Sequence, residues 1–392
     1  MNKTVQIKYS QQFTLSAIYF LMYAGFSTWY PIINQYFMKI GFDSIQTSIL
    51  ASIIPAIILV AQPMWGIAAD KMGRKLIFSS VLLIESIFLL AFIQNGNFLY
   101  FFFATIILTI FYAPLGMMMD SLTLDFAETN NKIEFGKVRM WASVGFAITA
   151  SLMGFFTENN LKIVFPIATA FHILAWFIII LHLQLPKQKI VHVQNGKLKS
   201  LLNRRILIFF GLVLLLGICT APMYNFYSVY LDEIGAPQKI IGLAIGLRAF
   251  IELPFFFTGN HWIRKFGMKN LILLSAGVTC LRLFLYSFIH NPYLALIVDT
   301  LQGISFALFV VAVTEYVNQK FPSQNRATGQ SLFNSSHFGA GAIIGNLLTG
   351  YLHKPIGINA VYFIVCLLAF LTTVGFYYFF KSEKTTIQAE RF

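Results

Sequence analysis

The sequence predicts an all-α membrane protein in which twelve transmembrane helices form two pseudo-symmetric six-helix bundles with cytoplasmic N- and C-termini. Three observations support this fold class. Of 392 residues, 57% are hydrophobic and only 11% are charged, whereas a soluble domain contains about 25% charged residues. Apolar segments long enough to cross a bilayer, which requires about 20 residues, recur along the whole chain. The motifs at the helix junctions also repeat after half the chain length.

Polar or turn-forming residues divide the chain into twelve apolar segments. The first is too long for the core of a signal peptide, so we expect it to remain as a transmembrane helix. Asn95-Gly96-Asn97 and His290-Asn291-Pro292 provide only tight turns, which are typical of neighbouring antiparallel helices. The expected helices are 13–38, 44–69, 75–94, 97–124, 138–157, 162–184, 205–231, 237–262, 269–290, 292–318, 325–353 and 356–380.

The basic residues predict the orientation. A net charge of +13 could indicate nucleic-acid binding, but Lys and Arg lie in short clusters between the apolar segments. If both termini are inside, 21 of the 28 basic residues fall in cytoplasmic segments and only Lys39, Lys162, Lys239 and Lys354 fall in outer loops. Cytoplasmic loops of membrane proteins carry such an excess. We therefore expect a multi-pass protein of the cell (plasma) membrane, with the lipid bilayer and no nucleic acid as a partner.

The longest polar connection divides the chain into two similar halves. We expect an N-terminal bundle over 1–185, a basic cytoplasmic linker over 186–204 and a C-terminal bundle over 205–392. Gly73 and Gly267, which follow the second and eighth helices, are 194 residues apart. Gly136, just before the fifth helix, and Gly329, in the first turn of the eleventh, are 193 residues apart. Parallel repeats of this kind are common in transporter folds.

The junction after the second helix, Gly66-Ile-Ala-Ala-Asp70-Lys71-Met-Gly73-Arg74-Lys75, resembles the signature loop of the major facilitator superfamily. The resemblance implies the major facilitator fold and a gating loop formed by Gly66, Asp70, Lys71, Gly73 and Arg74. The glycines permit a close helix approach and a tight turn, and the charged residues could form a cytoplasmic latch. The second-half copy has Arg264 in place of the aspartate.

A narrower resemblance is found in Asp120-Ser-Leu-Thr-Leu and in the stretch from Glu134 to Phe146. Both are similar to the branch that contains lactose permease, nucleoside symporters and phenylpropionate permease, and so imply a sugar:proton symporter-like protein. Lactose permeases have lysine, histidine and glutamate where this chain has Asp299, Gln302 and Ser305, and a sugar-stacking tryptophan in place of Phe146. The resemblance therefore extends neither to lactose nor to that proton pathway.

Ionisable residues inside the predicted helices are candidates for function, because each costs several kcal/mol unless it is paired or faces a wet cavity. The predicted helices contain three arginines and four carboxylates: Arg139, Arg248 and Arg282, and Glu85, Asp120, Glu252 and Asp299. If each arginine pairs with a carboxylate, one carboxylate lacks a fixed counter-charge and could bind the coupling proton. The expected proton-coupling or charge network contains Glu252, Arg248, Arg282, Asp299 and Glu85. As structural alternatives, Arg248 and Glu252 could neutralise one another on one helical face, and Glu85 could be an interhelical strut.

Polar and aromatic residues in the first, fourth, seventh and eleventh helices could line a wet cavity. Sugars and nucleosides have hydroxyls for hydrogen bonds and apolar faces for stacking, so this composition suits them. With the Asp120 and Arg139 pair, for which the resemblance implies contact with sugar, the expected substrate-binding residues are Asp120, Arg139, Phe146, Tyr23, Trp29, Asn34, Tyr112, Tyr224, Asn225, Asn334 and His337. Helix packing is the alternative for each aromatic residue, and for His337.

The sequence excludes several other functions. No P-loop, GxSxG or HExxH pattern is present, and the three cysteines are widely spaced in apolar segments, so we expect no enzyme activity, cofactor or metal. We expect a monomeric secondary active transporter that moves a sugar, oligosaccharide or nucleoside by alternating access with proton symport. A proton-driven exporter of sugars or drugs is the alternative, although 138–156 lacks the proline of the exporter signature. A receptor or scaffold would not need paired charges in both halves.

Overall fold

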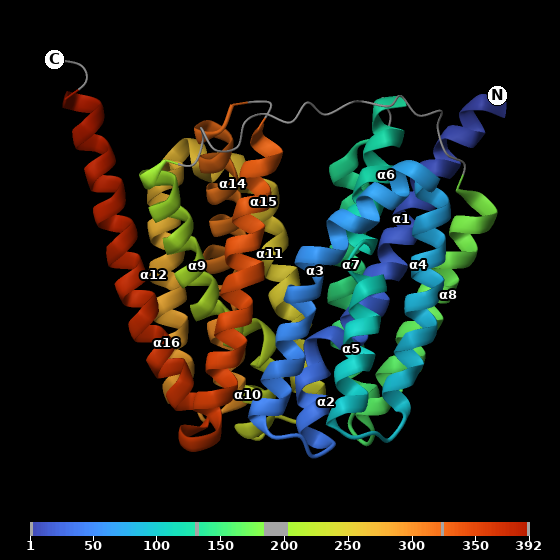
Figure 1. Cartoon of the computed structure of the whole chain (residues 1–392), viewed down its shortest axis with the longest axis horizontal. Coiled ribbons are helices and arrows are strands. Elements are labelled where there is room, and N and C mark those ends of the chain that lie inside the picture. Colours follow the sequence, from blue (N-terminus) through green and yellow to red (C-terminus); the bar gives the residue numbers. More distant parts are fainter. Residues whose placement is uncertain (1–2, 130–132, 184–202, 323–324, 390–392) are drawn as a thin grey trace. The chain divides into compact units, whose positions relative to one another are not determined.

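The computed structural model describes residues 3–129, 133–183, 203–322 and 325–389, and the side chains from residue 11 to residue 383 within these ranges. All regular elements in the described ranges are helices (Figure 1). Most of the expected linker, 186–204, lies outside the described residues. The contiguous halves 1–185 and 205–392 therefore stay a prediction.

The chain forms two compact units. The first contains Met1–Phe42, Ala56–Val191 and Ala236–Phe250, and the second contains Asp43–Pro55, His192–Gly235 and Ile251–Phe392. Each unit thus includes a short segment from the opposite half of the sequence. These segments belong to the two long helices that follow the first and seventh expected spans, so both helices are divided between the units.

The elements in the first half of the chain are, in order, α1 Lys3–Trp29, η1 Tyr30–Ile32, α2 Ile33–Lys39, α3 Ser44–Met72, α4 Arg74–Leu89, η2 Leu90–Ile93, α5 Phe98–Tyr112, α6 Leu115–Thr129, α7 Phe135–Phe156, η3 Leu161–Ile163 and α8 Val164–His182. In the first unit α1 packs against α7 and α8, and α4 packs against α8. A buried aliphatic and aromatic core joins these helices. Helix α1 is therefore central to the first unit.

The elements in the second half are α9 Arg204–Asn225, α10 Tyr227–Glu233, α11 Gln238–Phe266, α12 Met268–Phe288, α13 Pro292–Asp299, the π-helix η5 Gly303–Ala307, α14 Leu308–Lys320, α15 Arg326–Asn334, the π-helix η7 Ser335–Gly341 and α16 Ala342–Ala389. In the second unit α16 packs against α12 and α9. Helix α16 is kinked at Gly357, where φ is 78°.

The backbone confirms the internal repeat. Helices α3 and α11 both have 29 residues, and their first residues are 194 positions apart. Gly73 and Gly267, each the residue before a helix, have φ of 98° and 76°. The same offset relates Gly41 and Gly235, with φ of 102° and 81°. Residues with a Cβ rarely adopt this conformation, so the same tight junctions recur in both halves.

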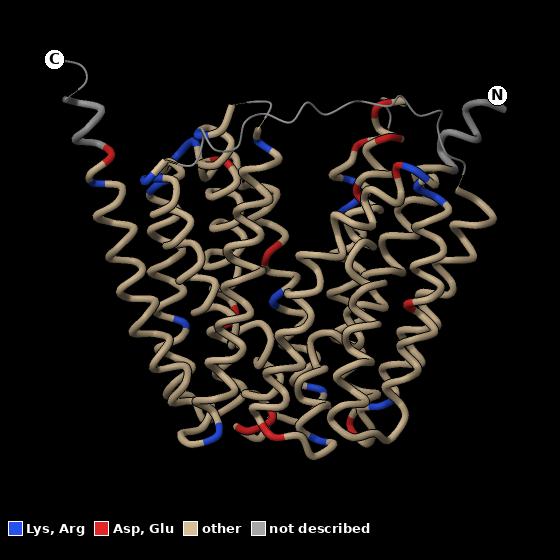
Figure 2. The backbone as a smooth tube through the Cα atoms, in the orientation of Figure 1, with Lys and Arg blue, Asp and Glu red and all other residues tan. Residues whose placement is uncertain are grey.

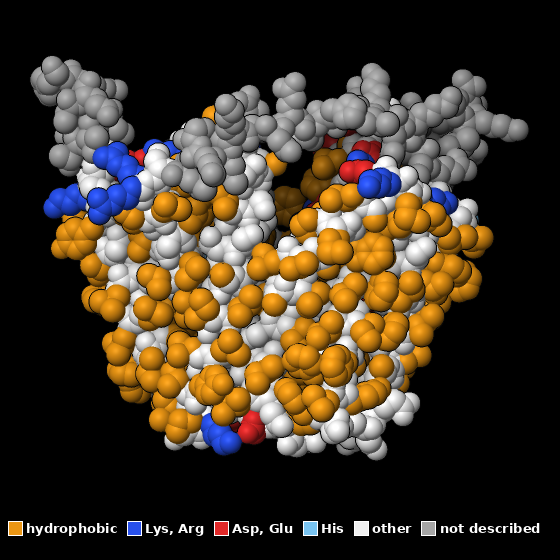
Figure 3. Space-filling view, in the orientation of Figure 1, with side chains coloured by type: hydrophobic (Ala, Val, Ile, Leu, Met, Phe, Trp, Pro, Cys, Tyr) orange, Lys and Arg blue, Asp and Glu red, His pale blue; other side chains and the backbone are white. Residues whose placement is uncertain are grey.

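The lengths and surfaces of the helices suit a bilayer. Within the described ranges, nine helices are long and apolar enough to cross a membrane, and the bent pair Pro292–Asp299 and Gly303–Lys320 could provide a tenth. Figure 2 shows most charged residues at helix ends, with few in the middle parts. Hydrophobic side chains cover most of the visible side surface of both units (Figure 3). This distribution is expected of helices that contact lipid tails.

The expected helix 205–231 is interrupted at Phe226, between α9 and α10. Two further helices are interrupted where the sequence predicted continuity. The expected helix 97–124 has a turn at Ala113 and Pro114 between α5 and α6, because proline cannot donate the hydrogen bond that a continuing helix needs. The expected helix 292–318 breaks after Asp299, with a bend of 44° before the next helical segment. The hydropathy of these segments does not reveal either interruption.

Glycines permit the close packing of α9 against η7 and α16. A Cβ on Gly341 would lie 2.9 Å from the Cα of Gly217, and one on Gly345 would lie 2.6 Å from the carbonyl oxygen of Ile218. In the first unit, a Cβ on Gly242 would lie 2.7 Å from the Cα of Gly154. Small residues therefore let helix backbones approach closely in both units.

Candidate functional site

In the first unit, Asp120 is shared between two donors. Arg139, near the start of α7, places Nε 3.1 Å from Oδ1 of Asp120 in α6. Tyr19 of α1 donates a hydrogen bond of 2.6 Å to the same oxygen. The Asp120 and Arg139 side chains are 32% and 46% exposed. The predicted contact is thus confirmed, and its exposed donors and acceptors remain available to a ligand.

A cluster of aromatic rings in the first unit surrounds Phe26. The Tyr112 ring of α5 stacks on it at 5.2 Å between centroids, and the Tyr30 ring lies 4.5 Å away. Trp29, Tyr23 and Phe146 also contact the Phe26 ring. Tyr23 in turn contacts Tyr19, the residue that binds Asp120. The structure therefore brings together most predicted substrate residues of this unit, with Phe26 as an addition.

In the second unit, Arg282 and Asp299 form a buried ion pair. Both side chains are 0% exposed, and Arg282 Nη2 lies 3.4 Å from Asp299 Oδ1. Tyr286 donates a hydrogen bond of 2.6 Å to Oδ1 and accepts one of 3.0 Å from Arg282 Nη2. Tyr227 of α10 donates to Oδ2. Both carboxylate oxygens are consequently satisfied, as a buried charge requires.

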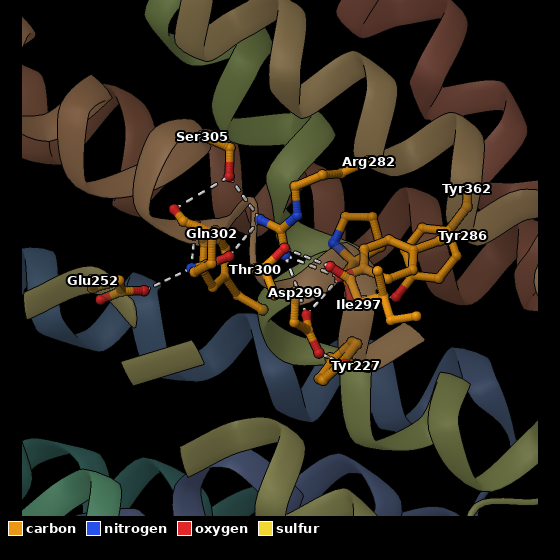
Figure 4. A network of polar contacts seen from close by, with 12 residues as sticks. Tyr227, Glu252, Arg282, Tyr286, Ile297, Asp299, Thr300, Gln302, Ser305 and Tyr362 are labelled. Carbon is orange, nitrogen blue, oxygen red and sulfur yellow. Dashed lines mark hydrogen bonds and ion pairs between the residues drawn. The ribbon is translucent and has the colours of Figure 1, made fainter. Parts of the chain in front are cut away.

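The network continues from this pair to a less buried carboxylate. Arg282 Nη1 donates to Gln302 Oε1 and, at 2.7 Å, to Ser305 Oγ. The amide nitrogen of Gln302 donates a hydrogen bond of 2.6 Å to Glu252 of α11 and contacts the Tyr224 hydroxyl at 3.4 Å. Figure 4 shows the chain of contacts from Tyr227 through Asp299, Arg282 and Gln302 to Glu252. Three predicted charged residues therefore belong to one network.

The interrupted helix positions this network. Asp299 is the last residue of α13, Gln302 lies in the break, and Ser305 lies in the π-helix η5. A π-helix shifts the direction of side chains relative to a regular helix and often marks a functional site. Binding sites in transporters are also commonly built on discontinuous helices. The break thus lets a single segment present three polar side chains to Arg282.

A second buried pair lies in the first unit, between α4 and α8. His172 Nδ1 is 2.6 Å from Glu85 Oε2, and the side chains are 2% and 0% exposed. His172 Nε2 lies 3.1 Å from the carbonyl oxygen of Met22 in α1. The sequence identified Glu85 but not its partner. A lone histidine in an otherwise apolar segment was the only available signal for His172.

The remaining predicted residues have different environments. His337 is buried, with Nδ1 3.3 Å from the Val213 carbonyl oxygen. Asn225 donates a hydrogen bond of 2.7 Å to Asn346. Asn34 is buried and Asn334 is exposed. On α11, Arg248 belongs to the first unit and Glu252 to the second.

The predicted gating loop contains a compact charge cluster. Arg74 Nη1 lies 2.6 Å from Asp125 of α6, whereas Nη2 lies 3.6 Å from Asp70. Asp70 is 70% exposed, and Asp125 is 24% exposed. Lys75 donates a hydrogen bond of 2.7 Å to the Leu183 carbonyl oxygen after α8. Asp125 is therefore a stronger partner of Arg74 than Asp70 is.

Several members of these networks were not predicted. Tyr19 and Phe26 are two such residues in α1, and Tyr286 and His172 are two others. Tyr286 lies four residues after Arg282 on one helical face, which could have signalled the contact. The partners of Tyr19 and His172 come from distant helices, 101 and 87 residues away along the sequence.

Membrane-length apolar helices, an internal repeat and polar networks within the helices define a membrane transporter of the major facilitator type. Residues 12–365 match the model of the family described as the MFS_1 like family. The chain belongs to this family, whose members are multi-pass membrane transporters rather than enzymes.

Relatives of known name cover nearly the whole chain. The uncharacterized transporter YwbF of Bacillus subtilis is 26% identical, and the maltose permease of Geobacillus stearothermophilus is 24% identical, each with 94% of both chains covered. The quinolone resistance protein NorA of Staphylococcus aureus is 24% identical over 87% of this chain and 89% of its own.

Solved structures show the same fold. A mutant of the nucleoside transporter NupG has a TM-score of 0.84 at 20% identity, with 94% of this chain and 100% of that chain covered. An inward-facing, unoccupied bacterial homologue of the human lysosomal transporter Spinster has a TM-score of 0.73 at 13% identity, with 97% and 98% covered. These likenesses establish the fold of this chain.

Proposed function

We propose that this protein is a proton-coupled secondary transporter that imports a sugar, oligosaccharide or nucleoside across the cytoplasmic membrane by alternating access. The observation that carries the proposal is the part-exposed Asp120–Arg139 pair beside an aromatic cluster. A carboxylate and a guanidinium offer an acceptor and a forked donor to neighbouring hydroxyls. Aromatic rings offer apolar faces on which a sugar or a nucleobase can stack.

The relatives support this substrate class. Maltose permease and raffinose permease are named for sugars, and NupG for nucleosides. Both kinds of substrate combine hydroxyl groups with a face that can stack on aromatic rings. The proposed site contains groups that suit both features, so it fits sugars and nucleosides alike.

Twelve crossings and cytoplasmic termini are part of the proposal. The nine candidate spans do not include α1, which has 27 residues, and they count Arg326–Glu383 as a single span of 58 residues. A membrane core of about 30 Å takes about 20 helical residues, so the segments on either side of Gly357 could each cross it. With the bent α13–α14 pair, this interpretation gives twelve crossings.

Transport into proteoliposomes tests the proposal. Purified protein would be assayed with labelled maltose, raffinose and uridine, with and without an imposed pH gradient. We expect accumulation of at least one of them that depends on an inward proton gradient. Arg139→Lys and Asp120→Asn should abolish binding as well as uptake, because lysine lacks the fork and asparagine leaves Arg139 without its counter-charge. Wild-type affinity in both folded variants would remove the pair from the substrate site.

Export is the second candidate function, because the relatives include the quinolone resistance protein NorA. The same vesicles distinguish the two. An exporter that exchanges a drug for protons would move a labelled quinolone in the direction opposite to the proton flow, driven by the proton gradient. The import proposal would be wrong if quinolone moved in this way while none of the three sugar or nucleoside probes moved.

A further inference from the structure

We propose that Glu85 and His172 form a one-proton binding site inside the first unit, and that this site carries the coupling proton. The coupling role rests on the proposed function, whereas the presence of the proton follows from the geometry of the pair. The site binds a proton between a side chain of α4 and a side chain of α8, next to the backbone of α1.

The hydrogen-bond partners fix the proton count of the pair. His172 Nε2 faces the Met22 carbonyl oxygen at 3.1 Å. A carbonyl oxygen can only accept, so Nε2 carries a proton. The 2.6 Å contact between Nδ1 and Glu85 Oε2 then needs one further proton, on either the nitrogen or the oxygen. The pair is therefore neutral overall and holds one exchangeable proton.

Loss of that proton would be costly in this conformation. The lone pair of Nδ1 would then face a carboxylate oxygen at 2.6 Å, and both side chains are almost completely buried. A buried charge without a counter-ion is strongly unfavourable. Glu85 Oε1 is also buried without a hydrogen-bond partner in the described residues, which adds to the cost of the ionised form. The proton should consequently leave only when the surroundings of the pair change.

Two other buried or half-buried carboxylates, Asp120 and Asp299, are less suited to this role. Asp120 contacts Arg139, and Asp299 contacts Arg282 and accepts from two tyrosines. Arginine does not lose its proton in proteins, so the basic partner in these two pairs cannot give up or take up a proton. Histidine is the side chain whose ordinary pKa allows proton exchange near neutral pH. Of Glu85, Asp120 and Asp299, Glu85 is thus the carboxylate whose basic partner can itself titrate. His353 and Glu233 form a second histidine–carboxylate pair in the described residues, but the Glu233 side chain is 36% exposed.

The elements around the pair supply no fixed charge to it within the described residues. Among the described residues, His172 is the one basic side chain in ion-pair contact with Glu85. The Tyr112 hydroxyl of α5 is the further titratable group that interacts electrostatically with Glu85. The neighbouring elements otherwise contribute the Met22 carbonyl and Gly25 of α1, the Ser86 carbonyl of α4, and Thr169 of α8, which donates to it. The charge of the pair therefore depends on its own proton.

Replacing Glu85 by glutamine tests whether the pair is used in coupling. Glutamine keeps the shape and can donate to His172, but it cannot bind and release a proton. We expect Glu85→Gln to retain exchange of labelled maltose or uridine across vesicles and to lose accumulation driven by a pH gradient, together with substrate-induced proton uptake. Glu158→Gln, at an exposed carboxylate, is the matched control and should behave as wild type. Accumulation by Glu85→Gln with wild-type pH dependence would overturn the proposal.

A substrate-free measurement separates this proposal from the proposed function. Infrared difference spectra across a pH titration of the substrate-free protein, in which alternating access changes the surroundings of the pair, should contain a carboxyl signal that disappears in Glu85→Gln and shifts in His172→Gln. The double variant, in which two amides can bond, provides a folded reference if either single variant is unstable. Absence of a Glu85-dependent signal would refute the proton site. Presence of the signal in a protein that transports without protons would refute only its coupling role.

Discussion

Tyr19 and Arg139 bind the same oxygen atom of Asp120, at 2.6 Å and 3.1 Å. Tyr19 is fully buried, whereas the two charged side chains are partly exposed. The tyrosine therefore fixes the carboxylate from the protein side and leaves the opposite side open. In this arrangement Tyr19 is a positioning residue for the proposed substrate contact.

Removing the Tyr19 hydroxyl should weaken substrate binding without abolishing transport. Tyr19→Phe deletes one hydrogen bond to a charged group, which we expect to cost about 1 kcal/mol, or about fivefold in affinity, at a partly exposed carboxylate. Isothermal titration with the transported probe measures this change. Tyr377→Phe, at an exposed tyrosine, is the control. Equal affinities for wild type and Tyr19→Phe would show that the hydroxyl does not position Asp120 for binding.

The opposite charges of Arg282 and Asp299 should stabilise the protein, because each one neutralises the other in a buried site. Asp299→Asn leaves the buried Arg282 charge without a carboxylate and should destabilise the protein by about 3–5 kcal/mol. Thermal unfolding in detergent checks this. The double variant Arg282→Met/Asp299→Asn should recover part of the loss, because it removes the stranded charge. Equal melting temperatures of wild type and Asp299→Asn would contradict the interpretation.

The pair of Asp43 and Lys354 predicts a pH-dependent stability. The backbone N–H of Gln46, which donates to Asp43 at 2.8 Å, and the Lys354 ammonium at 3.0 Å hold the pKa of Asp43 below its ordinary value. Because the folded-state pKa is lowered, the stabilisation is present above the unfolded pKa of about 4 and is lost as the pH falls through the folded pKa.

Lys354→Met should therefore lower the melting temperature slightly at neutral pH, and the difference from wild type should disappear in acid. The effect should be small because both side chains are substantially exposed. Lys354→Arg keeps the charge and serves as the control. A difference between wild type and Lys354→Met that persists after Asp43 is protonated would assign the effect to packing instead.

Asp70→Asn should slow alternation and leave substrate affinity largely intact. Asp70 is mostly exposed and contacts Arg74 only at 3.6 Å, while Arg74 keeps its shorter contact with Asp125. Asp125→Asn should therefore slow uptake more than Asp70→Asn does. Uptake rates and equilibrium binding on the same preparations test both statements. A large loss of affinity in Asp70→Asn, with unchanged conformational populations, would be inconsistent with a gating role.

Gly242→Ala should destabilise the first unit. Its Cβ would lie 2.7 Å from the Cα of Gly154 and 2.8 Å from the Ala150 carbonyl oxygen, both backbone atoms that cannot rotate away. Overpacking of this kind typically costs about 1–3 kcal/mol. Gly277→Ala is the matched control, since a Cβ there meets nothing within 4 Å. Thermal unfolding of the two variants should differ, with the control equal to or more stable than wild type.

Local patterns in the sequence were sufficient for most of the helices, the repeat and one of the contacts. Apolar segments and turn residues located most helices to within a few residues, and the Gly73–Gly267 offset identified the repeat that the backbone confirms. The pairing of Asp120 with Arg139 followed from a short connection between consecutive helices. These features depend on hydropathy and chain distance, which can be read along the sequence.

Only the tertiary structure decided which distant side chains meet. The Glu85–His172 contact joins α4 to α8, and the Tyr227–Asp299 contact joins α10 to α13. Such contacts depend on the rotation and depth of each helix, which are set by side-chain packing across the whole unit rather than by local periodicity. The sequence thus determined where charges enter the membrane helices, and the packing determined their partners.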